Sequence, residues 1–370
     1  MNRKEAFQFL ETADRINNPG GPIAAMPTPR ERVMAAVDLK SADAAVPVVP
    51  QITYANARLT GISFEDGMRD PEKMAKALVA GYRAFGYDGI YVGWESSFNL
   101  AAEAMGCTLR PGGGGIPSVS GGIVNGPDDL GKVLAADPER DGRLPLHLKA
   151  LELVRSEVGG DVPLFRYVPG PLTLAGLLRG QDRFLGDLIR NPDLIRDLLK
   201  LATAASRRFA AAVAERGADV VVVADPMASS SVISPKMFEQ FALPYIREVL
   251  AEARGAGCVP SLHVCGRTGP ILRKMAETGA RIVELDYAVD LKAAKEEIGR
   301  AVCIEGNVDP VSILLHGRPE DVEKEARGCV SKAGQGGGLI LSSGCEVPLD
   351  TPAENIRALV SASGRDRQSA

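Results

Sequence analysis

Short apolar runs alternate with helical segments along most of this chain, and no other feature of the sequence restricts the fold as strongly. Eight runs have the length and composition of strands, and they cover residues 45–52, 89–92, 163–168, 218–224, 258–265, 281–285, 301–304 and 338–341. Strands that are apolar on both faces are typical of buried parallel sheets. Eight such strands separated by helices predict the α/β class and a (β/α)8 TIM barrel, whose functional residues lie at the C-terminal strand ends.

The two ends of the chain fall outside this alternation. Residues 3–16 have helical spacing and are followed by a break rich in Asn, Pro and Gly, so we expect residues 1–27 to form a short N-terminal extension. The barrel is then expected to cover residues 28–362, and residues 363–370 are expected to form a C-terminal tail.

Composition excludes several classes of partner. The 370 residues carry a formal net charge of −4 and only 5% aromatic residues, so neither the basic surface nor the stacking platforms of a nucleic-acid-binding protein are expected. No apolar run reaches the length of a membrane span, and the N-terminus lacks the apolar core of a signal peptide. Six cysteines without a CxxC pair do not form a disulfide scaffold. We therefore expect a cytoplasmic protein with no membrane and no nucleic-acid partner.

The strand over residues 258–265 ends in a histidine and a cysteine that suit a metal site. Side chains alternate between the two faces of a strand, so His263 and Cys265 point the same way. Cys345 follows the last predicted strand and is a third candidate. Zinc binds His nitrogen and Cys sulfur, and catalytic zinc sites keep three protein ligands and one exchangeable position. The alternative is a buried histidine beside an inert buried cysteine, and the spacing alone leaves both interpretations open.

Three acidic residues near strand ends are further candidates, and each has a plainer alternative. Asp286 could be a displaceable fourth zinc ligand, or it could hydrogen-bond the loop backbone or a ligand imidazole. Asp225 could orient His263 or a substrate, although a strand-end aspartate more often caps the next helix. Glu346 could accept the proton of a thiol, and a solvated loop charge is the other interpretation.

Two other polar residues at strand ends are candidates for contacts with a cofactor. Tyr167 ends the third predicted strand, and Asn307 lies in a Gly-Asn turn after the seventh. In such a turn, local hydrogen bonds to the backbone are the usual role of an asparagine.

Several segments have an order and spacing found in a known group of barrels. They are Gly217 to Asp225, Ile233 to Tyr245, Glu284 to Asp286, Gly306 to Pro310 and, at the first helix, Thr28 to Arg32. Together they resemble the uroporphyrinogen decarboxylase superfamily over about residues 28–362. Within it, His263-Val264-Cys265 with a distant Cys345 is similar to the His-x-Cys and Cys pattern of the zinc-dependent methylcobamide:thiol methyltransferases, typified by methylcobamide:coenzyme M methyltransferase.

This resemblance implies a specific reaction. Zn²⁺ held by His263, Cys265 and Cys345 would bind a small-molecule acceptor, a thiol such as coenzyme M, as its zinc thiolate. The methyl donor would be a methylated corrinoid (cobalamin). The sequence has no Asp-x-His-x-x-Gly segment for holding a corrinoid, so the corrinoid would be free or carried by a corrinoid protein. A homodimer is one option for the assembly.

Two other functions are compatible with the same fold. The first is a metal-free lyase that resembles uroporphyrinogen decarboxylase and acts on a tetrapyrrole. Those enzymes use several arginines near the first strand, whereas the stretch from Pro50 to Arg58 contains a single one. The second is a barrel that binds a corrinoid without turning it over. Metal content distinguishes the methyltransferase from the lyase, and turnover of methylcobalamin distinguishes it from the binding protein.

Overall fold

The computed structural model describes residues 27–40, 45–112 and 116–364. The helix predicted over residues 3–16 lies outside the described residues, as do almost all of the predicted N-terminal extension and most of the predicted tail.

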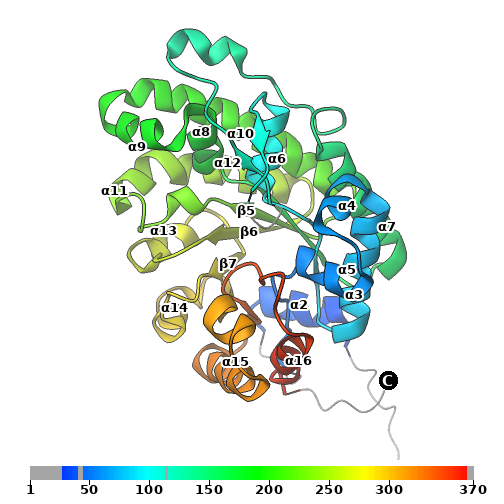
Figure 1. Ribbon diagram of the computed structural model, residues 1–370. Coiled ribbons are helices and arrows are strands. Elements are labelled where there is room, and N and C mark those ends of the chain that lie inside the picture. The colour runs from blue at the N-terminus through cyan, green and yellow to red at the C-terminus, as the bar shows by residue number, and fades with distance from the viewer. Residues whose placement is uncertain (1–26, 41–44, 113–115, 365–370) are drawn as a thin grey trace, which may run out of the picture.

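A sheet of seven parallel strands forms the centre of the molecule, and helices surround it (Figure 1). In their spatial order the strands are β1 (Ile90–Tyr91), β4 (Leu164–Pro169), β5 (Val220–Ala224), β6 (Val259–Val264), β7 (Ile282–Leu285), β8 (Cys303–Val308) and β9 (Leu339–Ser343). Each strand pairs with the next one in the chain, so the sheet curls in one direction. The predicted α/β class and the order of the barrel strands are confirmed.

The first predicted strand, residues 45–52, is the exception, because it is not a regular strand. Val48 makes a single parallel bridge to Leu341 of β9, with hydrogen bonds from Val49 N to Leu341 O (2.9 Å) and from Leu341 N to the carbonyl of Pro47 (2.8 Å). Proline has no N–H to donate to a ladder. Since Pro47 and Pro50 flank this short contact, the segment fills the eighth position of the ring with a few bonds instead of a ladder.

The floor of the barrel is closed by the first helix in the described part of the chain. Helix α2 (Pro29–Val37) begins with a capping box in which Thr28 Oγ1 accepts from Glu31 N (3.2 Å) and Glu31 Oε2 accepts from Thr28 N (2.7 Å). Its apolar face forms one hydrophobic cluster with the inward side chains of the strands. The buried members of this cluster are Val33, Ala36, Val37, Val49, Tyr91, Phe165, Val220, Val222, Ile282, Cys303 and Ile340.

A second and larger hydrophobic cluster fills the space between the strands and the outer helices. These helices are α3 (Ala57–Thr60), α4 (Phe64–Arg69), α5 (Pro71–Phe85), α6 (Ser97–Ala104), α7 (Leu144–Val158), α8 (Pro171–Arg179), α9 (Gln181–Arg190), α10 (Pro192–Glu215), α11 (Pro235–Met237), α12 (Leu243–Gly255), α13 (Leu272–Ala276), α14 (Leu291–Ile298), α15 (Pro319–Ala333) and α16 (Ala353–Ser361). In the described part of the chain, no helix combines the length and the apolar composition of a membrane span.

Residues 171–215 form three helices, α8, α9 and α10, with breaks at Gly180, whose φ is +86°, and at Asn191 before Pro192. Earlier in the chain, β2 (Leu109–Arg110) and β3 (Ser118–Val119) pair as a small antiparallel hairpin. Residues 113–115, which come between these two strands in the sequence, are not among the described residues.

The irregular first segment is held by a buried ion pair. Asp88 accepts from Val48 N through Oδ2 (2.7 Å), and its Oδ1 accepts from Nε and Nη2 of Arg32 in α2 (2.8 and 2.5 Å). The Asp88 side chain is fully buried and that of Arg32 is 12% exposed. Asp88 therefore joins the irregular segment around Val48, which is the seam of the barrel, to helix α2 on its floor.

Asp88→Asn is expected to lower the free energy of unfolding by about 3 kcal/mol, because it leaves a mostly buried guanidinium without its carboxylate. Glu157→Gln, in the surface pair between Arg83 and Glu157, is the control and should change stability by less than about 1 kcal/mol. Urea unfolding followed by circular dichroism gives both values. Equal losses in the two variants would contradict a structural role for the buried pair.

Candidate metal centre

The three residues predicted as metal ligands meet at the mouth of the barrel. His263 is an inward residue near the end of β6, and Cys265 follows that strand directly. Cys345 lies two residues beyond the end of β9. The His263 Nε2 atom lies 3.0 Å from Cys265 Sγ and 4.0 Å from Cys345 Sγ, and the two sulfurs are 3.9 Å apart. Among the described residues, these three are the one group of His, Cys, Asp and Glu side chains close enough to share a metal ion.

The spacing fits a tetrahedral ion. With ordinary zinc bond lengths, two sulfur ligands lie about 3.8 Å apart, and a sulfur and a nitrogen ligand about 3.6 Å apart. The observed separations of 3.0, 3.9 and 4.0 Å lie around these values and need shifts of roughly half an ångström. Two thiols and an imidazole are also the donor set that suits zinc. The site therefore fits a zinc ion with three protein ligands.

The thiols of the site affect each other's protonation. The hydrogen bond with Cys265 is the main reason that the pKa of Cys345 is lowered, and the nearby His263 lowers it further. The same hydrogen bond raises the pKa of Cys265, and burial adds to this effect. One proton shared between two sulfurs is the expected state of this pair without a metal, and a metal ion would replace that proton.

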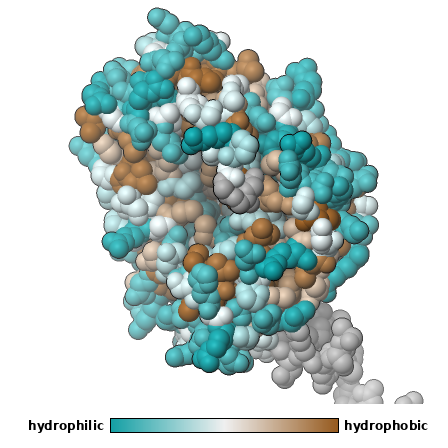
Figure 2. All heavy atoms as spheres, viewed as in Figure 1, coloured by the Kyte–Doolittle hydropathy of each residue, from teal (hydrophilic) through white to brown (hydrophobic). Residues whose placement is uncertain are grey.

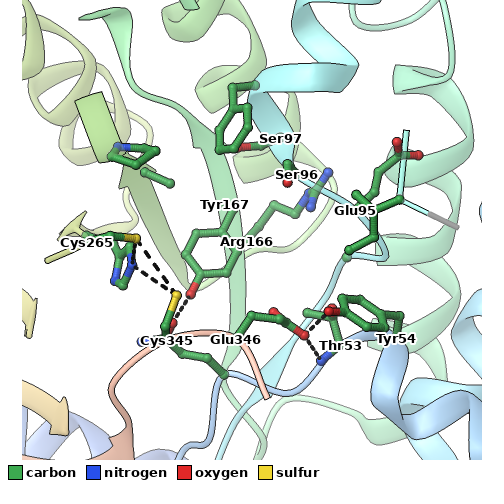
Figure 3. Close-up of a pocket in the computed structure, with 17 residues that line it drawn as sticks. Thr53, Tyr54, Glu95, Ser96, Ser97, Arg166, Tyr167, Cys265, Cys345 and Glu346 are labelled. Atoms are coloured by element: carbon green, nitrogen blue, oxygen red, sulfur yellow. Dashed lines mark hydrogen bonds between the residues drawn. The ribbon is translucent and has the colours of Figure 1, made fainter. Parts of the chain in front are cut away.

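The three side chains open into a cavity of about 320 Å³. Figure 3 shows the sulfurs of Cys265 and Cys345 on one side, and Glu346 extending toward Thr53 and Tyr54 on another. On the face shown in Figure 2, hydrophilic residues form most of the outline, and paler and hydrophobic residues lie toward the hollowed centre. Tyr167 also lines the cavity, and its hydroxyl donates to Gln51 Oε1 (2.8 Å).

The far wall of the cavity is charged. Glu95 and Arg166 both line it, and Arg143 forms an ion pair with Glu95 from behind. The Arg166 guanidinium is buried and donates from Nη1 to Val92 O (3.1 Å), while its Nε and Nη2 have no partner in the described structure. An acceptor molecule that reaches from the sulfurs to this wall would meet polar groups at its second end.

Glu346 is held firmly beside the metal ligands. Its Oε1 accepts from both the backbone N–H (2.9 Å) and the hydroxyl (2.7 Å) of Thr53. Burial raises the pKa of Glu346 to about 8, although the two hydrogen bonds from Thr53 oppose this shift. A carboxylate with a raised pKa accepts a proton more readily than an exposed glutamate does.

Asp286 and Asn307 support the loops around the site and do not join the three-residue group. Asp286 accepts from Gly266 N through Oδ2 and from Ala288 N through Oδ1, both at 2.8 Å. The Asn307 amide donates to the carbonyls of Asp286 (3.0 Å) and Val289 (2.9 Å). Asn307 is not among the residues that line the cavity. For both residues the observed contacts match the alternative role, hydrogen bonding to loop backbone.

Asp225 is buried and holds the beginning of α8. It accepts from the backbone N–H groups of Leu172 (3.0 Å) and Thr173 (2.8 Å), and from the Thr173 hydroxyl (2.6 Å). Burial raises its pKa to about 6. Asp225 thus caps α8, a helix that precedes it in the chain, and not the next one. The contact with the His263 ring, the other role considered for Asp225, is made by Glu284, whose Oε2 lies 3.2 Å from His263 Nδ1.

The polar network beneath the candidate metal centre was not predicted from the sequence. Glu284 on β7 and Glu305 on β8 are fully buried inside the barrel, and Tyr91 contacts both of them. A signal for them was available, because each glutamate interrupts an apolar strand at a position that faces inward. An acidic residue inside a buried strand requires a partner, and here the partner lies at the functional site.

The fold and the site together define a parallel α/β barrel with two thiols and an imidazole converging at its C-terminal strand ends. The sequence pattern of the family described as Uroporphyrinogen decarboxylase (URO-D) matches residues 28–365, and the chain belongs to this family.

Named proteins with similar sequences narrow the assignment within this family. The chain is 31% identical over 336 residues to the methylcobamide:CoM methyltransferase MtbA of Methanosarcina mazei, covering 90% of this chain and 96% of the relative. It is 32% identical over 341 residues to the methylcobamide:CoM methyltransferase MtaA of Methanosarcina barkeri, covering 90% and 97%. The uroporphyrinogen decarboxylase of Carboxydothermus hydrogenoformans is 27% identical over 308 residues, covering 80% and 84%.

A solved structure agrees with the sequence relatives. A methyltransferase from Methanosarcina mazei superposes with a TM-score of 0.83 at 31% identity, covering 92% of this chain and 99% of that one. The protein is thus an enzyme of the methyltransferase branch of the family.

Exposure and pKa predict which cysteine reacts first in the metal-free protein. Cys345 is half-buried beside the cavity and has a lowered pKa, whereas burial raises the pKa of Cys107 and Cys258 to about 11. Iodoacetamide at pH 7 is expected to modify Cys345 at least roughly tenfold faster than the two buried cysteines. Peptide mass spectrometry over time gives the rates. Uniform labelling of all cysteines would contradict the described burial.

Proposed function

We propose that this enzyme transfers a methyl group from a methylated corrinoid to a small thiol, and that the thiol binds at a zinc ion held by His263, Cys265 and Cys345. The observation that carries the proposal is the convergence of one imidazole nitrogen and two sulfurs on the wall of a cavity, all within 4.8 Å of one another. The names of the relatives, methylcobamide:CoM methyltransferases, support both the donor class and coenzyme M as the first acceptor to test.

Zinc, when bound, would lower the pKa of a coordinated substrate thiol so that it is a thiolate at neutral pH. The protein supplies three ligands, which leaves a fourth position for the substrate. Both oxygens of Asp286 already accept backbone N–H groups, so we place the substrate thiol in that position and not Asp286.

The remaining cavity residues hold the acceptor and receive its proton. Glu346 follows Cys345 in the chain and lines the same cavity, so its carboxylate, when ionised, is placed to take the thiol proton. Tyr167 forms part of the cavity wall. The sulfur forms a bond to the methyl carbon, the cobalt–carbon bond breaks with its electron pair staying on cobalt, and the products are a methyl thioether and a cob(I)amide. A corrinoid protein is the proposed carrier of the ring.

The cavity itself argues against the decarboxylase alternative. A tetrapyrrole with many carboxylates needs several cationic partners, yet Arg166 is the one arginine among the residues that line this cavity. Arg58, the single arginine of the first-strand region, forms a surface pair with Asp350 at 3.0 Å. The geometry of the site thus gives no support for binding a polycarboxylate.

Metal content tests the ligand set. Wild type purified without chelator, or reconstituted afterwards, is expected to contain one zinc per chain. Cys345→Ser removes a ligand and should lose at least about tenfold in zinc affinity, yet stay folded because the barrel has its own large core. Cys258→Ser is the matched control: its sulfur donates to Ala218 O (3.1 Å) away from the site, and zinc should be unchanged. Absence of zinc from reconstituted wild type would refute the metal site.

Turnover tests the reaction. Wild type with coenzyme M is expected to demethylate methylcobalamin, which is followed by the change in corrinoid absorbance. Cys265→Ala should lose at least about a hundredfold in rate, because the substrate thiolate would no longer be held. Corrinoid binding, measured by titration, should persist because the ring contacts the mouth and not the metal ligands. A variant that turns over at the wild-type rate would show that the metal does not activate the thiol.

A panel of acceptors identifies the substrate. Coenzyme M, uncharged thiols of similar length and non-thiol nucleophiles are compared under the same conditions. If no acceptor demethylates the corrinoid while the protein still binds it, the binding-protein alternative replaces the methyltransferase proposal.

A further inference from the structure

The carboxylate of Glu284 has an unusually complete set of partners. Its Oε1 is 3.0 Å from the Tyr91 hydroxyl and accepts from the Ser261 hydroxyl at 2.9 Å. Its Oε2 lies 3.2 Å from His263 Nδ1 and 3.4 Å from the Tyr167 hydroxyl. All of these side chains are buried or nearly so, and Glu284 is itself fully buried. Four polar groups therefore surround one side chain directly beneath the metal centre.

Hydrogen-bond counting fixes the charge of this group. The Tyr91 hydroxyl also lies 2.6 Å from Glu305 Oε1, but a phenol has only one proton to donate. Of its two carboxyl neighbours, one must therefore carry a proton and donate it to Tyr91. Glu284 Oε1 accepts from Ser261 and its Oε2 lies 3.2 Å from His263 Nδ1, whereas Glu305 Oε2 has no hydrogen-bond partner in the described structure. The arrangement is satisfied when Glu305 is the neutral acid and Glu284 is the carboxylate.

The ionised carboxylate of Glu284 lies against Nδ1 of His263, the ring nitrogen that does not point to the sulfurs. His263 Nε2 faces Cys265 Sγ at 3.0 Å, so Nδ1 is the nitrogen left to donate. Register reinforces this contact, because His263 on β6 and Glu284 on β7 are paired neighbours in the sheet. The Tyr167 ring packs edge-on against the imidazole, with 6.2 Å between ring centroids, and limits its rotation.

We propose that Glu284 is a positioning residue of the metal centre: as a carboxylate it accepts the Nδ1 proton of His263, fixes the tautomer and orientation of the ring, and directs the Nε2 lone pair at the metal. Glu305, through Tyr91, holds Glu284 in place as a neutral acid. This inference rests on the proposed zinc site and adds a residue that neither contacts the metal nor lines the cavity.

A carboxylate behind a ligand imidazole makes the imidazole a stronger donor. Loss of such a partner typically lowers metal affinity by about 10- to 100-fold. Glu284→Gln keeps the size of the side chain and removes its charge, so an effect of this size is expected. Glu305→Gln is the matched control: it is equally buried on the next strand, and an amide N–H can replace the acid proton that is donated to Tyr91. Its zinc affinity should stay within roughly threefold of wild type.

The measurement is zinc affinity by competition with a chromophoric chelator, on wild type, Glu284→Gln and Glu305→Gln. Cobalt(II) substitution adds a readout that does not need turnover, because a rotated or more weakly donating imidazole shifts the visible absorption bands. Thermal unfolding of the three metal-free proteins reports any general loss of structure.

The outcomes separate the inference from the proposed function. If wild type binds zinc and Glu284→Gln binds it equally well, or if both variants lose affinity to the same extent, Glu284 is not a specific positioning residue. If wild type binds no zinc, the proposed function itself fails. Should Glu284→Gln not fold, Ser261→Ala removes one donor from the carboxylate, and a several-fold loss of zinc affinity with an unchanged melting temperature is then expected.

Discussion

Closure of a parallel sheet into a ring is the constraint on which the rest of this structure depends. In a closed ring every second side chain of every strand points into a confined space, and that space must be filled or satisfied. At the floor it is filled by apolar side chains and sealed by α2. Toward the mouth the inward-facing residues become polar, and His263, near the end of β6, is one of them. The candidate metal centre therefore lies where the apolar filling of the barrel ends.

Burial of two glutamates inside such a ring is costly unless each charge has partners. The network around Glu284 supplies four contacts to one carboxylate, and burial together with the charge of Glu284 raises the pKa of Glu305 far above its usual value. Glu284 thus keeps its negative charge, and Glu305 is neutral. The kept charge lies against the histidine of the metal centre, which links the polar layer of the barrel to the chemistry at its mouth.

Much of this arrangement was predictable from the sequence, and the reasons are local. Strand alternation alone places His263 and Cys265 on one face, and the strand count places the end of β9 at the same rim. The pairing of Glu284 with His263 was not predictable, because it depends on the register between β6 and β7. The irregular segment at Val48 was overestimated as a strand, although the prolines on either side of it were a sign of weak pairing. The role of Asp225 could not be settled from the sequence, because a strand-end aspartate can either orient a neighbouring side chain or cap a helix. The structure shows that Asp225 caps α8.

The seam of the barrel has a consequence for its dynamics. In the ring, the segment around Val48 lies beside β9 and on the opposite side from β6, so it is adjacent to Cys345 and remote from His263. Gln51 and Thr53 continue from this segment and hold Ser343 and Glu346 on either side of Cys345. A metal ion bound by His263, Cys265 and Cys345 would span the mouth and connect the loosely paired side of the ring to the regular one. By linkage, ligation should favour the closed ring, and amide hydrogen exchange at Val49 and Leu341 should slow when the ion is present.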